Sequence, residues 1–561
     1  MSLSLRAIWT GLIVLLAMSV PFFFPQLGEK TFAAIEGLGC RIAEQRRFAI
    51  VVVALAAILL RLSVLSWSPV PIPEIHDEFS YLLAGDTFAH GRLTNPPHKM
   101  WVYFETFHVL QHPTYMSKFH PAQGAFLAFG EVLGHPWIGV LLSSSLMCAA
   151  ILWALQGWLP ARWALLGGVL AVLRFSIFGY WINSYWGGAV AALGGALVIG
   201  ATPRIIRFGR ARDAAILALG VGILANSRPF EGFIFCIPVA ATLLLWFARP
   251  KCADRRRILQ RVVFPFCAVA LLCGTFEAYY NWRVTGSPIL FPYTVYERTY
   301  WNLPVFIWQE PGPPVQENNP QFDAFYNHGY ARNTWFEGRI RNPRQFIFRC
   351  IFNCKFFVSF FLWPELCVLL VPPFVCLTDR RMRLLLIQIG VCLGGFLLVP
   401  WFQPHYAAPL TATTFIVVTQ GIRRLRKFRF RRVPTGIALS RAVVLLAVAL
   451  APFHQRYENM VPKLLRREEI AKQLNSTFGE HLVIVRYSTH HDPLEEWVHN
   501  RANIDFAKVV WAREIPGISL DPLLAYFRGR RVWLVEPDAK QPALVPYSLP
   551  GPSKESPHDV P

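Results

Sequence analysis

The sequence predicts an all-α polytopic membrane protein with about twelve transmembrane helices, followed by a small C-terminal α/β domain outside the cytoplasm. Of its 561 residues, 54% are hydrophobic and 14% are aromatic, which exceeds what a water-soluble core needs. The apolar residues are gathered in blocks that approach the ~20 residues a helix needs to cross the hydrocarbon. The basic residues are concentrated in alternate loops between these blocks.

Twelve apolar blocks are predicted to form the transmembrane helices. They are Ile8–Phe24, Phe48–Trp67, Trp137–Leu159, Trp163–Phe178, Tyr185–Ala201, Ala214–Ala225, Phe230–Phe247, Val262–Tyr280, Phe346–Leu377, Leu384–Val399, Tyr406–Thr419 and Ala442–Phe453. The segment Pro121–Leu133 is shorter and interrupted by glycine, so we expect it to lie in the membrane interface or to re-enter.

The distribution of charge predicts the orientation. A net charge of +21 could indicate a nucleic-acid partner, but alternation of basic loops with nearly uncharged ones is typical of the positive-inside pattern. The densest basic loop, Arg423–Arg432, is therefore predicted to be cytoplasmic. We expect no nucleic-acid partner and a multi-pass protein of the cell membrane, the inner membrane of a bacterium.

Residues 1–47 are predicted to form an N-terminal helix and a cytoplasmic linker. Ile8–Phe24 could be a secretory signal, but Arg41, Arg46 and Arg47 favour an uncleaved helix followed by a cytoplasmic segment. Arg6 opposes that orientation.

Residues 48–454 form the predicted transmembrane region, with external loops at 68–120 and 281–345. The aromatic density of the second loop fits either an interfacial belt, which is the simpler explanation, or a sugar-stacking surface. Residues 455–561 are predicted to be an extracytoplasmic soluble domain, with strands at His481–Tyr487 and Arg531–Val535 and a helix at Leu520–Phe527.

The tripeptide His76-Asp77-Glu78 follows the second apolar block, at the external face of the membrane. Carboxylates are costly to keep near hydrocarbon, which makes Asp77 and Glu78 candidate catalytic residues. Such a carboxylate can take a proton from a hydroxyl or hold a divalent cation. The alternative is a solvated loop with incidental acids.

Further polar residues fall on the same predicted face and are candidates for substrate binding. They are His76, Lys118, His120, Asn183, Arg228, Glu231, His405 and Tyr406. A lone arginine in such a turn is more often an anchor to lipid headgroups than a ligand. Several polar turns on the face that carries Asp77 favour one shared site, in which Lys118 and Arg228 suit a phosphate.

These motifs, taken in order, resemble the GT-C superfamily of membrane glycosyltransferases, especially the branch of protein O-mannosyltransferases and the lipid A aminoarabinose transferase. The acidic pair of that branch resembles His76-Asp77-Glu78, and its basic residue before prolines and a helix resembles Lys118–Pro121. Its Lys-Gly-Pro turn is similar in position to Ser227-Arg228-Pro229, and its late Tyr-x-x-Pro turn is similar to Tyr406–Pro409. The likeness covers roughly Phe48–Thr419. Asn183–Gly188, Asn281–Pro292 and the small C-terminal domain depart from it, which leaves the substrate open.

The resemblance implies a GT-C-like architecture and a sugar donor on a polyprenyl phosphate at the outer leaflet. Asp77, or else Glu78, would be the base on a glycan, lipid or protein acceptor hydroxyl, and transfer would invert the anomeric carbon. Lys118 and Arg228 would stabilise the leaving phosphate. No cofactor is implied with certainty, although Asp77 or Glu78 could hold a divalent cation.

Two other classes of protein remain as alternatives. A transporter or flippase of lipid-linked precursors would also need many helices and buried polar groups, but it predicts repeated halves with paired broken helices. We find no such repeat in the sequence. An envelope-assembly scaffold would use the C-terminal domain to bind a partner.

Overall fold

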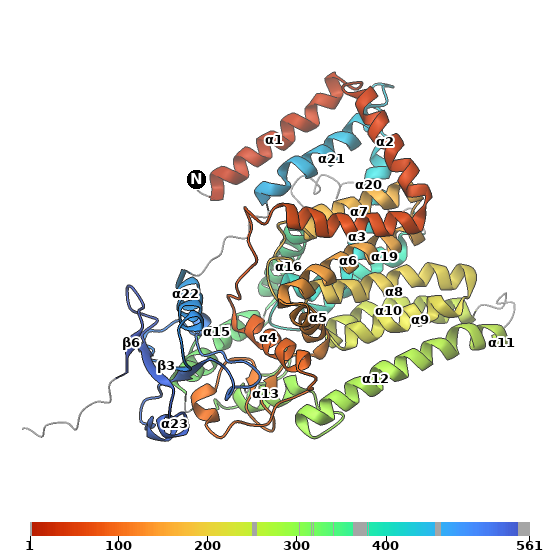
Figure 1. Ribbon diagram of the computed structural model, residues 1–561. Coiled ribbons are helices and arrows are strands. Elements are labelled where there is room, and N and C mark those ends of the chain that lie inside the picture. The colour runs from red at the N-terminus through yellow and green to blue at the C-terminus, as the bar shows by residue number, and fades with distance from the viewer. Residues whose placement is uncertain are drawn as a thin grey trace, which may run out of the picture.

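The computed structural model describes residues 3–248, 255–301, 303–315, 317, 319–339, 342–362, 379, 381–454 and 462–547. Helices dominate it, and a small sheet lies at one end of the helical bundle (Figure 1). Helices α3, α6, α8, α9 and α12 pack in this order, each against the next, while α1, α2 and α21 form an arm at the upper edge of the view. The predicted α-helical class with a small α/β part at the C-terminus is confirmed in this outline.

The α-helices follow the predicted apolar blocks. They are α1 Leu3–Phe23, α2 Glu29–Glu44, α3 Arg46–Ser63, α4 His76–Ala89, α5 Pro121–Val132, α6 Pro136–Trp158, α7 Ala161–Phe175, α8 Gly188–Phe208, α9 Ala211–Ala225, α10 Pro229–Ala248, α11 Arg255–Ile258, α12 Phe264–Thr285, α13 Pro292–Tyr300, α14 Pro320–Phe322, α15 Tyr330–Gly338, α16 Pro343–Phe361, α19 Arg383–Gly395, α20 Thr411–Leu425, α21 Thr435–His454, α22 Pro462–Ser476 and α23 Asp521–Tyr526. Each predicted block contains a helix, although the second half of Phe346–Leu377 lies outside the described residues.

The count of twelve spans is not confirmed. Among the described residues, four helices are long and apolar enough to cross a membrane: Pro136–Trp158, Gly188–Phe208, Pro229–Ala248 and Arg255–Thr285. Helices α7, α9 and α20 have 15 residues each, which is about 22 Å at 1.5 Å per residue. That is shorter than the ~30 Å hydrocarbon layer. These short helices pack inside the bundle against the longer ones.

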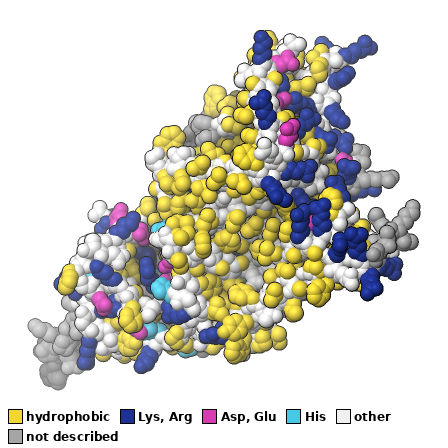
Figure 2. Space-filling view, turned by 45° about the vertical axis from the view of Figure 1, so that its right-hand side comes forward, with side chains coloured by type: hydrophobic (Ala, Val, Ile, Leu, Met, Phe, Trp, Pro, Cys, Tyr) yellow, Lys and Arg dark blue, Asp and Glu magenta, His cyan; other side chains and the backbone are white. Residues whose placement is uncertain are grey.

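The surface of the helical bundle has the distribution of side chains expected for a membrane protein. Hydrophobic side chains cover a broad face, and Lys and Arg gather toward its right and upper edges (Figure 2). At the upper edge, Glu36 of α2 forms ion pairs with Arg426 at 2.8 Å and with Arg441 at 3.0 Å. Most of the segment expected to be a linker, residues 29–44, is therefore a helix tied to the loop after α20 and to α21.

The first external loop is more structured than the sequence suggested. It contains α4, the 3₁₀ helix η1 Trp101–Phe104 and a two-stranded hairpin of β1 Val109–Leu110 and β2 Met116–Ser117. In the second external loop, Tyr296 and Trp335 are fully buried and Trp308 is 59% exposed. Tyr296 packs with Tyr300 and Phe322 in a core beneath the first loop. Neither a belt nor an open stacking surface accounts for these buried rings, because the aromatic residues hold the two loops together.

The C-terminal sheet has the strand order β4-β3-β5-β6. Strand β3 His481–Val485 pairs in parallel with β4 Val509–Arg513 and with β5 Arg531–Val535, and β6 Val545–Pro546 pairs antiparallel with β5. The predicted strands at 481 and 531 and the helix near 520 are confirmed, whereas β4 was not predicted. A buried parallel strand of five residues resembles other short apolar runs, so the pattern alone did not identify β4.

The two faces of this sheet are covered by different parts of the chain. Val483 and Val485 face Ile470 and Leu474 of α22 in one core. The alternate residues Leu482 and Ile484 share a core with Leu83, Tyr103, Phe104, Val109 and Tyr115 of the first external loop. The loop therefore shares with α23, through Leu523, the layer that covers this face of the sheet.

We predict that the C-terminal sheet lies outside the cytoplasm, because the densest basic loop, Arg423–Arg432, precedes the single helix α21 that leads to it. A green fluorescent protein that matures only in the cytoplasm should stay dark when fused after Pro561. The same reporter fused to a chain that ends after Arg432 should fluoresce. Fluorescence from the Pro561 fusion would invert the orientation of the whole chain.

Candidate active site at the external face

The site begins where a proline-rich stretch becomes a helix. Prolines at 69, 71 and 73 keep the chain extended after α3, and Ile75 is still in the β conformation at φ −126°. Helix α4 then starts at His76, which places Asp77 and Glu78 in its first turn. Acidic side chains are favoured there because the free N–H groups carry partial positive charge.

Glu78 is the structural member of the acidic pair. Its side chain is buried, and its two oxygens accept hydrogen bonds from the backbone N–H groups of Glu74 at 2.7 Å and Tyr185 at 3.2 Å. Burial raises the pKa of Glu78 to about 8, against the opposing effect of these two bonds. Glu78 thus joins the proline-rich stretch to the turn before α8.

Asp77 is the accessible member of the pair, with a side chain that is 31% exposed. Its Oδ2 lies 3.3 Å from Nδ1 of His76 and 3.6 Å from Nε2 of His108. Burial by the surrounding loops acts to raise the pKa of Asp77. The two imidazoles and the charge of Lys118 together lower this pKa by more, so it lies well below its usual value. Asp77 is therefore a carboxylate at neutral pH.

His108 is held in an unusual backbone conformation, with φ at 63°. Its N–H donates to the Tyr296 hydroxyl at 2.8 Å, and its carbonyl accepts from the Ser80 hydroxyl at 2.6 Å and from the Lys118 N–H at 3.1 Å. Left-handed conformations cost a non-glycine residue ~1 kcal/mol or more, so the surroundings must impose this one. The result is an imidazole directed at Asp77.

Two cations lie in the same region: Lys118 is buried, and the side chain of Arg228 is 19% exposed. Lys118 Nζ forms an ion pair with Glu297 at 3.3 Å and lies over the rings of Tyr293 and Tyr296. Arg228, in the turn before α10, lies over the ring of Tyr406 at 4.7 Å and 3.8 Å from a carboxylate oxygen of Glu231. Burial lowers the pKa of Lys118, and Glu297 opposes this effect. Both cations interact electrostatically with one another, and Lys118 also interacts with Asp77.

The remaining predicted residues divide into two groups. His405 hydrogen-bonds through Nδ1 to the Tyr180 hydroxyl at 2.8 Å, and His120 Nδ1 lies 4.0 Å from Glu277. Burial, and then the charge of Arg228, lower the pKa of both histidines, so they belong to the same polar region. Asn183 does not: its side-chain oxygen accepts from the buried Arg61 guanidinium at 2.8 Å, which ties the end of α3 to the turn after α7.

His76, Asp77 and His108 could hold a metal ion. Each offers one ligand atom, and the three atoms lie within 4.8 Å of one another. Both ring nitrogens of His76 are buried without a hydrogen bond to any described residue. Two imidazoles and one carboxylate form a donor set suited to Zn²⁺ and similar ions. The donors present therefore fit a divalent cation.

An apolar groove of about 540 Å³ borders the polar region. Helices α4, α5, α9 and α12 supply residues of its wall, among them Phe88, Ala125, Ile223 and Phe276. One end is formed by Pro121, Ala122 and Asn226, where the Ala122 N–H donates to the Asn226 carbonyl at 3.0 Å. His120 and Arg228 are therefore one and two residues away from the wall of the groove.

Sequence reasoning missed His108, Glu297 and Tyr293. The many histidines of the first loop indicated that one of them could belong to the site. However, His108 lies 31 residues after Asp77, and this separation gives no indication of contact. Glu297 lies among aromatic residues of the second loop, and no pattern in the sequence pairs it with Lys118. These contacts depend on how the two external loops fold over one another.

Comparison with known sequences finds no matching family model and no matching curated protein. Among solved structures, the oligosaccharyltransferase of Archaeoglobus fulgidus in the apo form is similar at 12% identity and a TM-score of 0.46, over 78% of this chain and 62% of that one. Its complex with Zn and sulfate gives 14% identity and a TM-score of 0.48, over 87% and 67%. ArnT from Cupriavidus metallidurans, bound to undecaprenyl phosphate, gives 13% identity and a TM-score of 0.43, over 87% and 92%.

This chain thus spans 62% of the archaeal enzyme in its apo form. Both neighbours are glycosyltransferases of the GT-C type, the class that the sequence motifs resemble. Because the TM-scores lie below 0.5, the chemistry of the site has to be argued from the residues of this chain.

Glu78 and Asp77 should affect stability differently. Glu78→Ala leaves two buried N–H groups without acceptors, which should lower the free energy of unfolding by ~1–3 kcal/mol. Asp77→Ala removes a partly exposed carboxylate that accepts no backbone N–H group, so the lost interaction with the imidazoles and Lys118 should lower the free energy of unfolding by less than Glu78→Ala does. Thermal unfolding of the purified protein in detergent measures both. An equal loss in the two variants would contradict the structural role of Glu78.

Proposed function

We propose that this protein is an integral membrane glycosyltransferase that moves a sugar from a polyprenyl-phosphate donor to an acceptor hydroxyl outside the cytoplasm, with inversion of the anomeric carbon. The observation that carries the proposal is one accessible carboxylate, Asp77, in the same polar region as two cations, the buried Lys118 and the partly exposed Arg228, at the end of an apolar groove. A proton acceptor, a phosphate site and a lipid site are the three parts that this reaction requires.

The groove suits the lipid of the donor. Its wall is apolar, and Phe276 and Leu272 of α12 are exposed beside it on a helix long enough to span the membrane. A polyprenyl chain can enter such a groove from the bilayer without crossing water. Its phosphate would then lie near His120 and Arg228, which adjoin the polar end of the groove.

The chemistry then follows from the charges. Asp77 takes the proton from the acceptor hydroxyl as the new bond forms between that oxygen and the anomeric carbon. The bond between the anomeric carbon and the phosphate oxygen breaks, and the phosphate leaves with the bonding pair. Lys118 and Arg228 stabilise the negative charge that develops there, more effectively than in water because Lys118 is buried and Arg228 is only 19% exposed. Glu78 is a weaker candidate for the base because both of its oxygens already accept backbone N–H groups.

A divalent cation held by His76, Asp77 and His108 is a second element of the proposal. Such an ion would act as a Lewis acid that lowers the pKa of a bound hydroxyl. His76, Asp77 and His108 would then hold the ion and fix its position, and the free oxygen of Asp77 would remain as the proton acceptor.

Asp77→Asn keeps the shape of the side chain and removes the base, so sugar transfer should fall by a factor of ~100 or more. The assay uses purified protein with a labelled polyprenyl-phosphate sugar and a panel of acceptors, and it follows release of lipid phosphate together with product. Asp521→Asn, in the exposed first turn of α23, is the matched control and should retain full activity. Normal transfer by Asp77→Asn would exclude Asp77 as the base, and lipid movement without release would indicate a transporter.

The metal proposal predicts one bound Zn²⁺ for each chain after removal of adventitious ions with a chelator. Calorimetric titration of the wild type should give a single site, and His108→Ala should weaken it at least tenfold because one of three ligands is lost. His328→Ala, whose side chain is 73% exposed, is the control. Equal affinity for Zn²⁺ in the His108 variant would show that the ion does not bind at His76, Asp77 and His108.

A further inference from the structure

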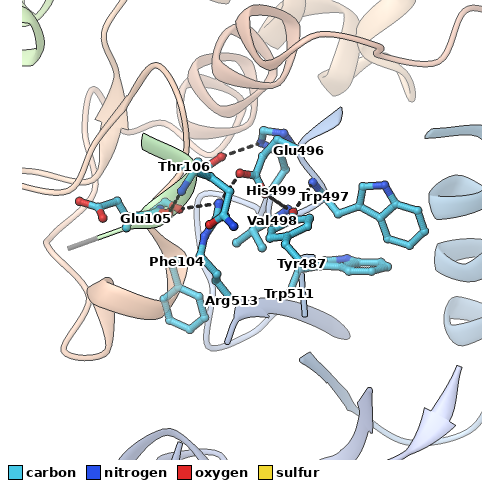
Figure 3. A network of polar contacts seen from close by, with 12 residues as sticks. Phe104, Glu105, Thr106, Tyr487, Glu496, Trp497, Val498, His499, Trp511 and Arg513 are labelled. Atoms are coloured by element: carbon cyan, nitrogen blue, oxygen red, sulfur yellow. Dashed lines mark hydrogen bonds and ion pairs between the residues drawn. The ribbon is translucent and has the colours of Figure 1, made fainter. Parts of the chain in front are cut away.

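The C-terminal sheet is joined to the first external loop by buried charge as well as by apolar packing. Arg513, at the end of β4, is fully buried and forms an ion pair with the buried Glu496, which also accepts a hydrogen bond from the Tyr487 hydroxyl. The Arg513 guanidinium donates to the backbone carbonyl of Glu105 at 3.5 Å and to the Gln321 side chain at 2.9 Å. Arg513 therefore contacts both external loops, and Figure 3 shows it beside Glu105 of the first.

His499 makes a second junction close to the candidate active site. Its imidazole stacks on the ring of Phe79, with ring centres 3.7 Å apart and planes within 7°. Its Nδ1 lies 3.5 Å from the Thr106 hydroxyl (Figure 3), and its backbone carbonyl accepts from Arg467 of α22 at 3.1 Å. Arg467 also lies over the Phe79 ring at 5.3 Å. The backbone of His499 is thus held by α22 of the C-terminal region, and its ring packs against the first turn of α4.

These contacts hold the two chain segments that carry His76, Asp77 and His108. Phe79 is two residues after Asp77 on α4, and Glu105 and Thr106 come just before His108. His108 holds a left-handed backbone conformation, which persists only where the surroundings impose it. Phe107 adds a ring contact to His76, with centres 5.0 Å apart. The distance between Asp77 and His108 therefore depends on two segments that the C-terminal region holds from one side.

We propose that the C-terminal region, residues 462–547, is part of the catalytic unit, and that His499 and Arg513 are positioning residues for Asp77 and His108. The proposal rests on the glycosyltransferase function proposed above. His499 acts as a ring: burial lowers its pKa well below the ordinary value, and its Nε2 has no hydrogen-bond partner among the described residues. A phenylalanine ring can therefore keep the stack on Phe79, and it loses only the 3.5 Å contact with Thr106.

The alternative is that the junction only attaches the sheet to the membrane region. The two roles differ in what a substitution changes. A loosened attachment lowers stability without changing turnover by the folded protein. A displaced Asp77 or His108 lowers kcat while donor affinity, which depends on the groove and the cations, is retained, because a shift of ~1 Å at a reacting group can cost as much as 100-fold in rate.

The test compares His499→Ala with His499→Phe in the full-length protein, in the donor-release assay. His499→Ala should lower kcat about tenfold, with an unchanged KM for the donor, and His499→Phe should restore kcat to within about twofold of the wild type because the ring stack is kept. Leu474→Ala, in helix α22 on the face of the sheet opposite the first external loop, is the stability control. It should lower the Tm at least as much as His499→Ala and leave kcat unchanged.

The outcomes separate this inference from the proposed function. If Asp77→Asn abolishes transfer and His499→Ala has the kcat of the wild type, the positioning role is overturned and the proposed function stands. A Leu474→Ala variant that loses kcat in parallel with its Tm also overturns positioning, because general destabilisation then explains the effect. If Asp77→Asn transfers sugar normally, the transferase function stands, but Asp77 is not its base and the positioning role built on it fails. If the wild type releases no lipid phosphate, the proposed function itself fails.

Phe79→Leu provides the same test from the other side of the stack, should His499→Ala not fold. It removes the ring on α4 and leaves the whole C-terminal region intact. A lower kcat with an unchanged KM supports positioning, and the kcat of the wild type overturns it. Arg513 is less suited to substitution, because its loss would leave the Glu496 carboxylate buried without its partner, which is strongly destabilising.

Discussion

The candidate site depends on the two backbone hydrogen bonds that the Glu78 carboxyl group accepts. They join the proline-rich stretch before α4 to the turn before α8, and they determine where the first turn of α4 lies. Asp77, one residue earlier on that turn, is consequently directed toward His76 and His108 and remains partly open. Adjacent residues of a helix point in directions about 100° apart. This is why one carboxylate of the pair is buried in the scaffold while the other is available to a substrate.

A second constraint is the cost of charge near hydrocarbon. The protein buries several arginines, and it satisfies them mostly with backbone carbonyls instead of carboxylates. Arg61 donates to the carbonyls of Ser68 and Pro69, and Arg174 donates to that of Phe360. Such bonds offset much of the desolvation cost and fix the ends of helices. Lys118 and Arg228 differ, because each lies over aromatic rings near a single carboxylate, an arrangement that leaves part of the positive charge for a ligand.

The site is assembled from segments that are distant in the chain and are held from two directions. From one direction, the helices of the bundle hold the turn with Arg228 and the turn with His405, and α4 packs beside them. The C-terminal sheet covers the first external loop and contacts both α4 and the 105–108 segment. A sheet that uses a loop of the membrane region as its second layer cannot move independently of that region, because movement would expose the shared core.

The sequence by itself determined the class of protein, the positions of the helices, two strands and a helix of the C-terminal region, and the polar residues around which the site is built. These follow from composition and from short-range patterns, since an apolar run, a proline or an acidic pair has a physical consequence where it stands. The number of full spans was not determined, because short helices such as α7 and α9 are apolar through burial in protein instead of contact with lipid. Only the tertiary structure decided that Glu78 supports Asp77, that Asn183 serves Arg61, and that His108, Glu297 and His499 belong near the site. Each of these contacts joins residues brought together by loop closure over tens to hundreds of positions, and no local pattern encodes such a distance.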